Sequence, residues 1–435
     1  MSEHLSAVPH LTTAAAGPLV AFEQAIIDHA HASEAWFREQ WKLTPAPFYA
    51  SVDLRHAGFK LAPVDTNLFP AGFNNLNPSF WPLCVQAVQT YFERFQNIPR
   101  CVLLIPENHT RNQFYMESLA TLQKIIVQAG FDVRIGSLLP DLTEATLVTL
   151  DSGTEILLEP LRREGDRVMV DDFAPCTVLL NNDLSTGLPE ILKDISQPIL
   201  PPPELGWSAR LKSTHFRFYA EVAREFAALV GIDPWLIDPM FRNCGEVDFA
   251  RGETSPCLTG NIDALITALS EKYREYGIED APFAMVKADA GTYGMGVMTV
   301  HSSADITELN RKQRNKMART KEGVAIRNVI IQEGVYTHET WGDEGNVAEP
   351  VVYMLDHHVV GGFYRVHKDR GHNENLNSPG MRFEPLAFAD CCIAPAVGED
   401  SADASAQHQN RFYVYGVVAR LALLAAAREL AAVKS

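Results

Sequence analysis

The chain has 435 residues and a formal net charge of -17, from 37 Lys and Arg against 54 Asp and Glu. This length allows two or three domains and excludes a small disulfide-stapled module. So acidic a chain is not expected to bind nucleic acid or an anionic membrane surface, although a local basic site for a small anion is compatible with it.

The cysteines and the two ends of the chain indicate the cellular compartment in which the protein is expected. The seven cysteines are scattered without CxxC spacing, which argues against a disulfide framework and suits a reducing compartment. Residues Met1–Gly17 lack the basic region and apolar core of a secretion signal. The apolar segment Val414–Val433 contains Arg420, Arg428 and Glu429, so we interpret it as a packed helix and not a membrane span. A cytoplasmic protein is expected.

The segment Ser51–Pro78 is predicted to be irregular, because Asn, Asp, Gly and Pro recur in it. Long irregular segments inside folded chains are often functional. Arg55 and Asn67 are the leading candidates there for holding a substrate, and Lys60 and Asp65 also stand out among its polar residues. A solvated connecting loop explains the same composition equally well.

The next elements predict a parallel sheet. Apolar residues from Trp81 to Phe95 have helical spacing, Cys101–Ile105 has the composition of a buried strand, Tyr115–Ala129 is a predicted helix ending at Gly130, and Phe131–Ile135 is the next strand. Strand, helix and strand in this order indicate a βαβ unit and an α/β (α+β) fold.

A third buried strand, Cys176–Leu180, runs into polar residues 181–183, which either bind a ligand at the sheet edge or simply form a turn. Pro201, Pro202 and Pro203 mark a boundary. The predicted organisation is therefore an N-terminal, substrate-side α/β domain over residues 1–200, a catalytic region over 201–390, and a C-terminal helical segment over 391–435 that packs on it.

Residues 281–300 (APFAMVKADAGTYGMGVMTV) have the outline of strand, glycine-rich loop and strand. No helix follows the glycines, so the segment is neither a Rossmann turn nor a P-loop. Glycines allow backbone N–H groups to approach phosphate oxygens, and a lysine adds positive charge. The candidate phosphate-binding residues are Lys287, Gly291, Thr292, Tyr293, Gly294 and Gly296. An ordinary β-hairpin with glycines in its turn is the alternative.

The following segments resemble, in their order, the ATP-grasp architecture. The resemblance implies a phosphate contact for Lys212, at the start of a helix that we expect Ser213 to cap, and an adenine slot lined by Gln332, Glu333 and Val335 after the predicted strand Asn328–Gln332. Two further predicted strands, Pro350–Leu355 and Val359–Arg365, precede a loop with the sequence ENLNSPG, which is similar to the Asn-x-x-Ser-Pro loop of bacterial glutathione synthetases.

The late arginine and this loop complete the implied site. Arg365 and Lys287 are the implied catalytic residues, Arg365 steadying the transferred phosphoryl group. The implied Mg²⁺ ligands are Glu349, Glu374, Asn375 and Asn377. Simpler interpretations stay open: Glu333 as a solvated hinge carboxylate, the two asparagines as turn formers and Arg365 as a surface ion pair. Arg242 is a further substrate-binding candidate, with a plain loop as the alternative.

The runs NNDLSTGLPEILKDI, GWSARLKSTHF, KADAGTYGMGVMTV and NLNSPG look like the glutamate–cysteine ligases of certain proteobacteria. The resemblance implies ligation of L-glutamate, through γ-glutamyl phosphate, to L-cysteine, which gives γ-glutamylcysteine, ADP and phosphate in the first step of glutathione biosynthesis. ATP and Mg²⁺ are the implied cofactors. Another ATP-grasp carboxylate–amine ligase and a non-catalytic nucleotide-binding regulator remain alternatives. Only small-molecule partners are expected, without nucleic acid or membrane, and a homo-oligomer is left open.

Four histidines crowd one region of the sequence. His357, His358, His367 and His372 lie within sixteen residues of one another. No H-x-x-x-H helix accompanies them, and the surrounding pattern is that of strands, so a zinc site is not expected.

Overall fold

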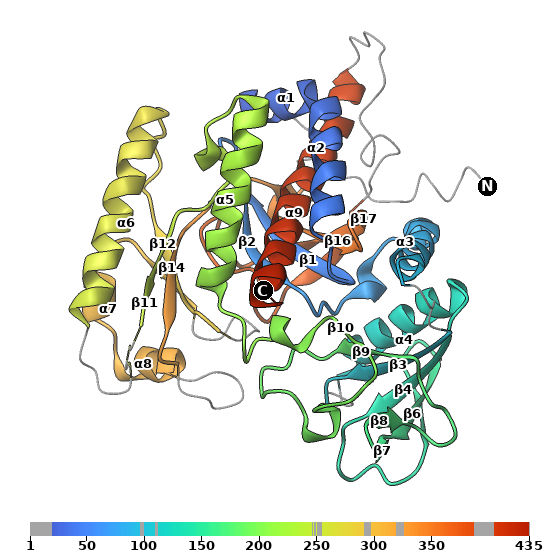
Figure 1. Cartoon of the computed structure of the whole chain (residues 1–435). Coiled ribbons are helices and arrows are strands. Elements are labelled where there is room, and N and C mark those ends of the chain that lie inside the picture. Colours follow the sequence, from blue (N-terminus) through green and yellow to red (C-terminus); the bar gives the residue numbers. More distant parts are fainter. Residues whose placement is uncertain are drawn as a thin grey trace.

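A computed structural model describes residues 20–95, 100–108, 112–245, 247, 249, 255–290, 297–318, 326–386 and 404–434 of the chain. The described residues form three main β-sheets with helices packed on them, which makes a mixed α/β protein (Figure 1). The candidate loop residues Gly291, Thr292, Tyr293, Gly294 and Gly296 lie outside the described residues.

The first sheet is antiparallel and has the order β18-β17-β16-β1-β2, with β15 beside β16. Its strands are β1 (Tyr49–His56), β2 (Leu61–Asn67), β15 (Thr340–Trp341), β16 (Asn346–Leu355), β17 (His358–His367) and β18 (Arg382–Pro385). It combines strands from the first 200 residues with strands from beyond residue 340, so the predicted division at residue 200 does not coincide with a sheet boundary.

The prediction of an irregular segment at Ser51–Pro78 is wrong for its first half, because β1 and β2 pair there as a hairpin. Ala50, Val52 and Leu54 are fully buried in one core and alternate with more polar residues. This period-two pattern favours a strand, and the energy of burying one face outweighs the turn preferences of the Asn, Asp and Pro residues nearby. Two short 3₁₀ helices follow, Phe73–Asn75 and Pro78–Phe80.

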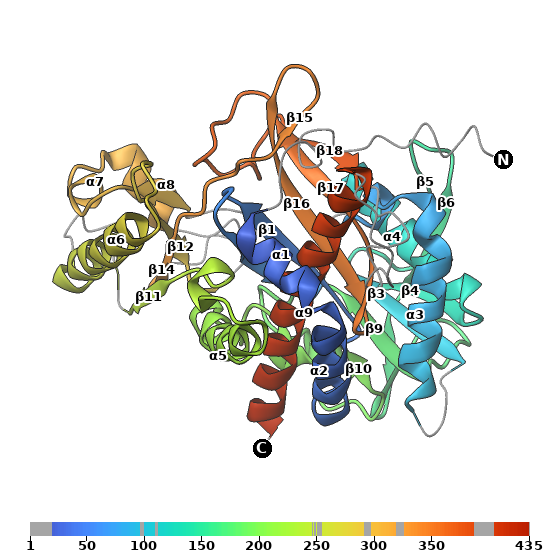
Figure 2. The same ribbon diagram turned by 90° about the horizontal axis from the view of Figure 1, so that it is seen from above.

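Helices cover the two faces of the first sheet differently. The C-terminal helix α9 (Ala404–Lys434) packs against β1, β2 and β16 on one face (Figure 2), together with α1 (Ala21–Asp28). On the other face, α3 (Trp81–Glu93) contacts β16 and β17. It covers the end of the sheet that carries Tyr49, Tyr353 and Phe363, and leaves the end with Asp53 and Glu349 for the site described below.

The second sheet has the order β10-β9-β3-β4-β6-β5 and is parallel except for β5. Its strands are β3 (Cys101–Pro106), β4 (Asp132–Ser137), β5 (Thr146–Thr149), β6 (Glu155–Pro160), β9 (Thr177–Asn181) and β10 (Ile199–Leu200). Helix α4 (Gln113–Gln128) connects β3 to β4, and Gly130 follows it with φ +97°, so the predicted strand–helix–strand unit is present. A small hairpin, β7 (Arg162–Glu164) and β8 (Arg167–Met169), and the 3₁₀ helices Glu190–Leu192 and Pro203–Leu205 complete this part.

The third sheet lies on the side of the molecule away from the second (Figure 1) and is antiparallel, in the order β11-β14-β12-β13. Its strands are β11 (Phe241–Cys244), β12 (Ala284–Ala288), β13 (Met298–Val300) and β14 (Val329–Glu333). Helix α6 (Pro256–Glu275) packs on it, and the small helices α7 (Ala304–Thr307) and α8 (Arg311–Ala318) follow β13. The predicted strands on both sides of the glycine-rich segment are therefore confirmed.

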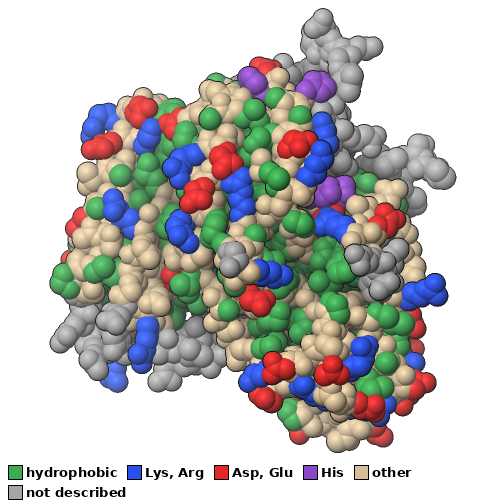
Figure 3. Space-filling model, in the orientation of Figure 1, with side chains coloured by type: hydrophobic (Ala, Val, Ile, Leu, Met, Phe, Trp, Pro, Cys, Tyr) green, Lys and Arg blue, Asp and Glu red, His purple; other side chains and the backbone are tan. Residues whose placement is uncertain are grey.

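Helix α5 (Lys212–Val230) packs against α9 and α2 (Ala30–Leu43), and the 3₁₀ helix Pro234–Leu236 leads from it to the third sheet. Most of α9 from Phe412 to Ala427 is buried, as expected for a packed helix. Within the described parts of the chain, no helix has the length and apolar character to cross a bilayer. Figure 3 shows acidic and basic side chains intermingled on the face of the molecule that Figure 1 presents.

Candidate active site

Five charged side chains share the open half of one face of the first sheet. Asp53 pairs with Asp65 across the β1–β2 hairpin, and Glu349 pairs with Arg365 across β16 and β17. Asp53 also pairs with Val351, two residues from Glu349 on β16, and Arg55 lies two residues beyond Asp53 on β1. Paired residues, and residues two apart on a strand, face the same way. The strand register therefore brings these five side chains together.

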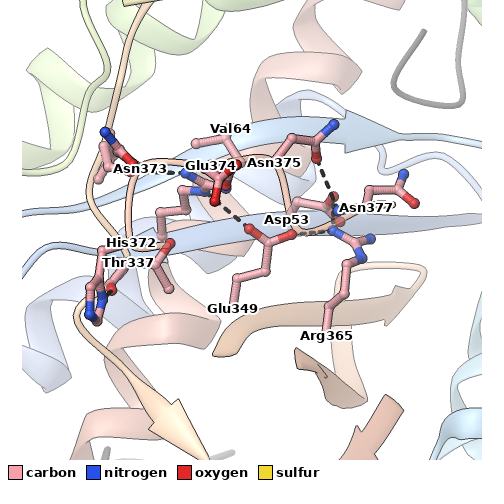
Figure 4. A network of polar contacts seen from close by, with 12 residues as sticks. Asp53, Val64, Thr337, Glu349, Arg365, His372, Asn373, Glu374, Asn375 and Asn377 are labelled. Atoms are coloured by element: carbon pink, nitrogen blue, oxygen red, sulfur yellow. Dashed lines mark hydrogen bonds and ion pairs between the residues drawn. The ribbon is translucent and has the colours of Figure 1, made fainter. Parts of the chain in front are cut away.

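Two arginines and two of these carboxylates form a buried ion-pair cluster (Figure 4). Arg365 Nη1 donates to Asp53 Oδ2 over 2.9 Å and also contacts Glu349 Oε1. Arg55 Nε donates to Glu349 Oε2 over 3.0 Å, so Glu349 lies between two guanidinium groups. The alternative of a surface ion pair for Arg365 is wrong, since only 8% of this residue is exposed.

The pKa shifts follow from this arrangement. Burial acts to raise the pKa of Glu349, but Arg55 and Arg365 lower it further than burial raises it. Burial raises the pKa of Asp53, and the negative charges of Glu349 and Asp65 add to the effect against the attraction of Arg365. Burial acts to lower the pKa of Arg365, but Asp53 and Glu349 hold it above its ordinary value. Arg365 therefore stays charged at every physiological pH.

The two predicted phosphate-binding lysines lie beside this cluster. Lys287 on β12 donates from Nζ to Gln332 Oε1 over 2.7 Å and to the Val64 carbonyl over 3.0 Å. Burial lowers the pKa of Lys287 to about 8, although the nearby Asp65 carboxylate acts to raise it. Lys212 Nζ donates to Asp65 Oδ1 over 2.7 Å and lies 3.9 Å from the centre of the Trp207 ring. The tertiary structure thus gathers two lysines and two arginines around three carboxylates.

The start of α5 differs from the prediction, because the helix begins at Lys212 and Ser213 is not its cap. The cap comes instead from Asp289, immediately after β12. The Ser213 backbone N–H and hydroxyl donate to Asp289 Oδ1 and Oδ2, each over 2.7 Å, and the Lys212 N–H donates to the Asp289 carbonyl over 2.7 Å. Helix N-termini leave N–H groups without helical partners, and here a carboxylate from a distant segment satisfies them.

Gln332 and Glu333 lie on opposite faces of β14, as neighbouring strand residues do. Gln332 faces Lys287, as the bond above shows. The Glu333 carboxylate is 1% exposed, so the interpretation of a solvated hinge carboxylate is wrong. Its Oε2 accepts from Lys60 Nζ over 2.8 Å, from the Met240 N–H over 2.9 Å and from Trp235 Nε1 over 3.2 Å.

Burial raises the pKa of Glu333 and lowers that of Lys60, while each opposes the shift of the other. Lys60 lies next to the β1–β2 turn, so its ion pair with Glu333 links the hairpin to the end of β14. Arg55 links the hairpin to the segment after β14 as well, since its Nη1 donates to the Val335 carbonyl over 3.2 Å.

The ENLNSPG loop reaches the cluster through its backbone. Arg55 Nη2 donates to the Glu374 carbonyl over 2.5 Å. The Glu374 carboxylate accepts from Arg370 Nη1 over 2.8 Å and from the Gly371 N–H over 2.7 Å, within its own loop. Asn375 Oδ1 accepts from the Asn377 N–H over 3.0 Å, which is the geometry of a side-chain-closed turn. Of the four predicted metal ligands, Glu349 is the one that lies inside the ion-pair cluster.

The predicted substrate residues are placed differently. Arg55 is central to the cluster. Asn67 lies at the end of β2, two residues beyond Asp65, and its Oδ1 accepts from the Phe69 N–H over 2.9 Å. Arg242 is exposed on β11 opposite Ile331, so it lies on the other face of the third sheet from Gln332. The structure therefore brings Arg55 to the site, places Asn67 at its margin and leaves Arg242 outside it.

Sequence reasoning missed two residues of the site, Asp53 and Asp289. The signal for Asp53 was the alternation of Val52 and Leu54 with polar residues, which was outweighed by the turn-forming composition of the longer segment. Nothing local signals Asp289, because its partner Ser213 is 76 residues away in the chain.

The four histidines do not converge. Asp356 and His357 form the β16–β17 turn, His358 begins β17, and ligand atoms of these three residues lie within 4.8 Å of one another. His367 and His372 instead contact the carbonyls of Pro379 and Thr337. Arg94 already forms an ion pair with Asp356, so the charge of that carboxylate is compensated by the protein.

Comparisons with known proteins assign the chain to a family. The family model described as glutamate–cysteine ligase matches residues 23–430. A crystal structure from Methylobacillus flagellatus KT, described as "Putative gamma-glutamylcysteine synthetase", is 55% identical to this chain and superposes with a TM-score of 0.88. The match covers 98% of this chain and 99% of the other. No curated protein sequence matches the chain.

Two more distant structures are also similar in part. D-alanyl-alanine synthetase A from Vibrio cholerae O1 biovar eltor is 10% identical to this chain and has a TM-score of 0.33. The match covers 73% of this chain and 80% of the synthetase. A glutathione synthetase-like effector from Globodera pallida is 11% identical, covers 84% and 83% of the two chains, and has a TM-score of 0.37. Scores this low do not establish a common fold.

Proposed function

Since this chain belongs to the glutamate–cysteine ligase family, we propose that it uses ATP to join L-glutamate to L-cysteine. The products are γ-glutamylcysteine, ADP and phosphate, in the first step of glutathione biosynthesis. The observation that carries the assignment of the site is the convergence of four cations, Lys212, Lys287, Arg55 and Arg365, at one end of the first sheet.

The chemistry needs such a site. A carboxylate is a poor acyl donor at neutral pH, and phosphorylation by ATP turns the γ-carboxylate of glutamate into an acyl phosphate. The cysteine amine then attacks the acyl carbon and phosphate leaves. The protein must neutralise the polyphosphate and stabilise the charge that develops on oxygen during transfer.

Lys287 suits the binding of a phosphate because its present partners are neutral. The Gln332 amide oxygen and the Val64 carbonyl accept its hydrogen bonds, and burial has lowered its pKa to about 8. An anion that reaches Lys287 gains a buried cation without displacing a carboxylate from it. Lys212 supplies a second charge beside Asp65, and we assign both lysines to the nucleotide phosphates.

The remaining nucleotide contacts follow from the third sheet. We assign Gln332, the Glu333 backbone and Val335 to the adenine slot at the end of β14, where the buried Glu333–Lys60 pair supports the strand from behind. Asp289, two residues before the glycine-rich segment 291–296, is hydrogen-bonded to the end of α5 that carries Lys212. In this proposal the segment closes over the phosphates.

Arg365 is assigned to the transferred phosphoryl group or the tetrahedral intermediate. Of the four cations at the site, Arg365 is the one that pairs with two carboxylates, Asp53 and Glu349, and these fix the direction of its guanidinium group. Asn67 and Arg55, on the hairpin beside it, are the proposed substrate-side groups. Arg242 keeps a substrate role only if the substrate extends to the other face of the third sheet.

The donor set of the site suits Mg²⁺, which prefers carboxylate and amide oxygens. Glu349, Glu374, Asn375 and Asn377 are the residues that would hold it, with Glu374 exchanging its present partner Arg370 for the ion. A bound Mg²⁺ would neutralise phosphate oxygens during transfer.

The test of the function is phosphate release from Mg²⁺-ATP with single pairs of amino acids. Release that depends on glutamate and cysteine together, with γ-glutamylcysteine identified by mass spectrometry, supports the proposal. Release with other pairs only would point to a different carboxylate–amine ligase. ATP binding without release for any pair would point to a nucleotide-binding regulator.

A further inference from the structure

A further buried ion pair lies outside the candidate active site and involves the C-terminal helix α9. Arg210 Nε donates to both carboxylate oxygens of Glu429, over 3.2 Å and 3.0 Å, and the two side chains are 1% and 5% exposed. Glu429 is close to the end of α9, and Arg210 precedes α5 by two residues. The pair therefore joins the end of the chain to the segment that carries Lys212.

His215 on α5 completes this cluster. Its Nδ1 lies 3.4 Å from Glu429 Oε2, and its Nε2 lies 3.0 Å from Thr66 Oγ1. Burial and the charge of Arg210 lower the pKa of His215 to about 4, so the ring is neutral at pH 7. At this distance Nδ1 makes no hydrogen bond with Glu429, which acts on the ring as a nearby charge, while Nε2 contacts the Thr66 hydroxyl.

Arg210 and His215, the two partners of Glu429, both contact Thr66. Arg210 Nη1 donates to the Thr66 carbonyl over 2.9 Å, and His215 contacts the Thr66 hydroxyl. Thr66 follows Asp65, whose carboxylate accepts the hydrogen bond of Lys212 Nζ. The network thus holds the backbone of β2 at the residue next to the partner of Lys212.

Stability alone does not account for this arrangement. Taking an arginine and a glutamate out of water costs several kcal/mol, and apolar residues of similar volume often stabilise a core as well or better. A lysine side chain has four rotatable bonds, so its direction depends on what holds its ammonium group. Trp207 adds to this control, because both Arg210 and Lys212 lie over its ring.

We propose that Glu429 is a positioning residue for nucleotide binding: through Arg210 and His215 it fixes Thr66, and thereby the Asp65 carboxylate that orients Lys212. The C-terminal helix is then part of the support of the nucleotide site. This inference rests on the proposed function, in which Lys212 contacts the nucleotide phosphates.

The experiment compares Glu429→Gln with a matched control, Glu34→Gln, which disrupts a different ion pair of the same helix α9. Arg420 on α9 donates to Glu34 on α2 over 2.8 Å and 2.6 Å, which is a second ion pair that anchors α9 but does not touch Thr66. For Glu429→Gln we expect the KM for ATP to rise about tenfold, with kcat and the KM for glutamate within about threefold of the parent values. For Glu34→Gln we expect a lower Tm and an unchanged KM for ATP.

A third variant separates this inference from the proposed function. Lys212→Met is expected to abolish ADP binding in calorimetry. If Lys212→Met binds ADP like the parent protein, the assignment of Lys212 fails, whatever Glu429 does. If Lys212→Met loses ADP while Glu429→Gln keeps the parent KM for ATP, the role of Glu429 is overturned and the ion pair is structural.

Should Glu429→Gln fail to fold, the double variant Arg210→Met with Glu429→Met provides the test, since it removes both buried charges together. A folded double variant with a raised KM for ATP supports positioning. A folded double variant with the parent KM for ATP overturns it.

Discussion

Asp53 lies directly opposite Asp65 across the β1–β2 hairpin, yet the two carboxylates bind cations from different parts of the fold. Asp53 accepts from Arg365 on β17, within the same sheet, and Asp65 accepts from Lys212 at the start of α5. Two like charges at paired positions are destabilising unless each has a counter-ion. The hairpin therefore depends on both cations, and it links the arginine side of the site to the lysine side.

Lys287→Met should raise the free energy of unfolding of the nucleotide-free protein at pH 7 by about 1–3 kcal/mol while abolishing ATP-dependent product formation. The reason is the burial that lowers the pKa of Lys287 to about 8. Between this pKa and the ordinary value of 10.5, the unfolded chain binds a proton that the folded chain does not. The Lys287 side chain therefore makes the free energy of unfolding of the parent protein rise with pH over this range. Urea unfolding at pH 7 and pH 9 checks both statements, and product formation at wild-type rates would refute the assignment of Lys287.

Arg365→Met should destabilise the protein by about 3–5 kcal/mol at pH 8, because it leaves Asp53 and Glu349 buried without the cation that they share. Without it their pKa values rise in the folded state, so stability is lost as pH rises through them and the destabilisation should be smaller at pH 5. Urea unfolding at the two pH values measures this difference.

The control for this prediction is Arg370→Met. Arg370 pairs with Glu374 at the surface, with side-chain exposures of 39% and 42%, and the pair should contribute less than about 1 kcal/mol. An equal loss of stability at pH 5 and pH 8 for Arg365→Met would contradict the ion-pair account of the cluster.

Lys60→Met should cost about 3–5 kcal/mol, since it leaves the buried Glu333 carboxylate without its counter-ion. In the double variant Lys60→Met with Glu333→Leu, both charges are absent, and much of the stability should return. A double-mutant cycle by urea unfolding gives the coupling energy. Additive losses would show that the two residues do not act as a pair.

Asp289→Asn should weaken ATP binding more than Ser213→Ala does. The first change removes the charge and one of the two acceptors at the start of α5, whereas the second removes only the hydroxyl bond and keeps the one from the backbone N–H. Loss of a helix cap costs about 1 kcal/mol, and here the same residue also holds the segment next to Lys287. Calorimetric titration with ADP compares the two variants, and equal affinities would argue against a tie between α5 and the end of β12.

The regular elements around the site could be predicted from local pattern alone. The strands before and after the glycine-rich segment, the βαβ unit at β3, α4 and β4, and the buried C-terminal helix all follow from apolar periodicity, because burial of one face dominates the choice between helix and strand. The hairpin at β1 and β2 could not be predicted in this way, since its alternation is short and lies beside many turn-forming residues.

By itself the amino-acid sequence determined most of the regular elements, the family resemblance and the residue types of the site, including both lysines and Arg365. Only the tertiary structure decided that Asp53 and Asp289 belong to the site, that the Glu333 carboxylate faces away from Lys287, and that Glu429 reaches Thr66 through Arg210. The physical reason is the range of the interactions: periodicity and propensity act over a few neighbours, whereas ion pairs and caps join residues that only strand register and helix packing bring within 3 Å.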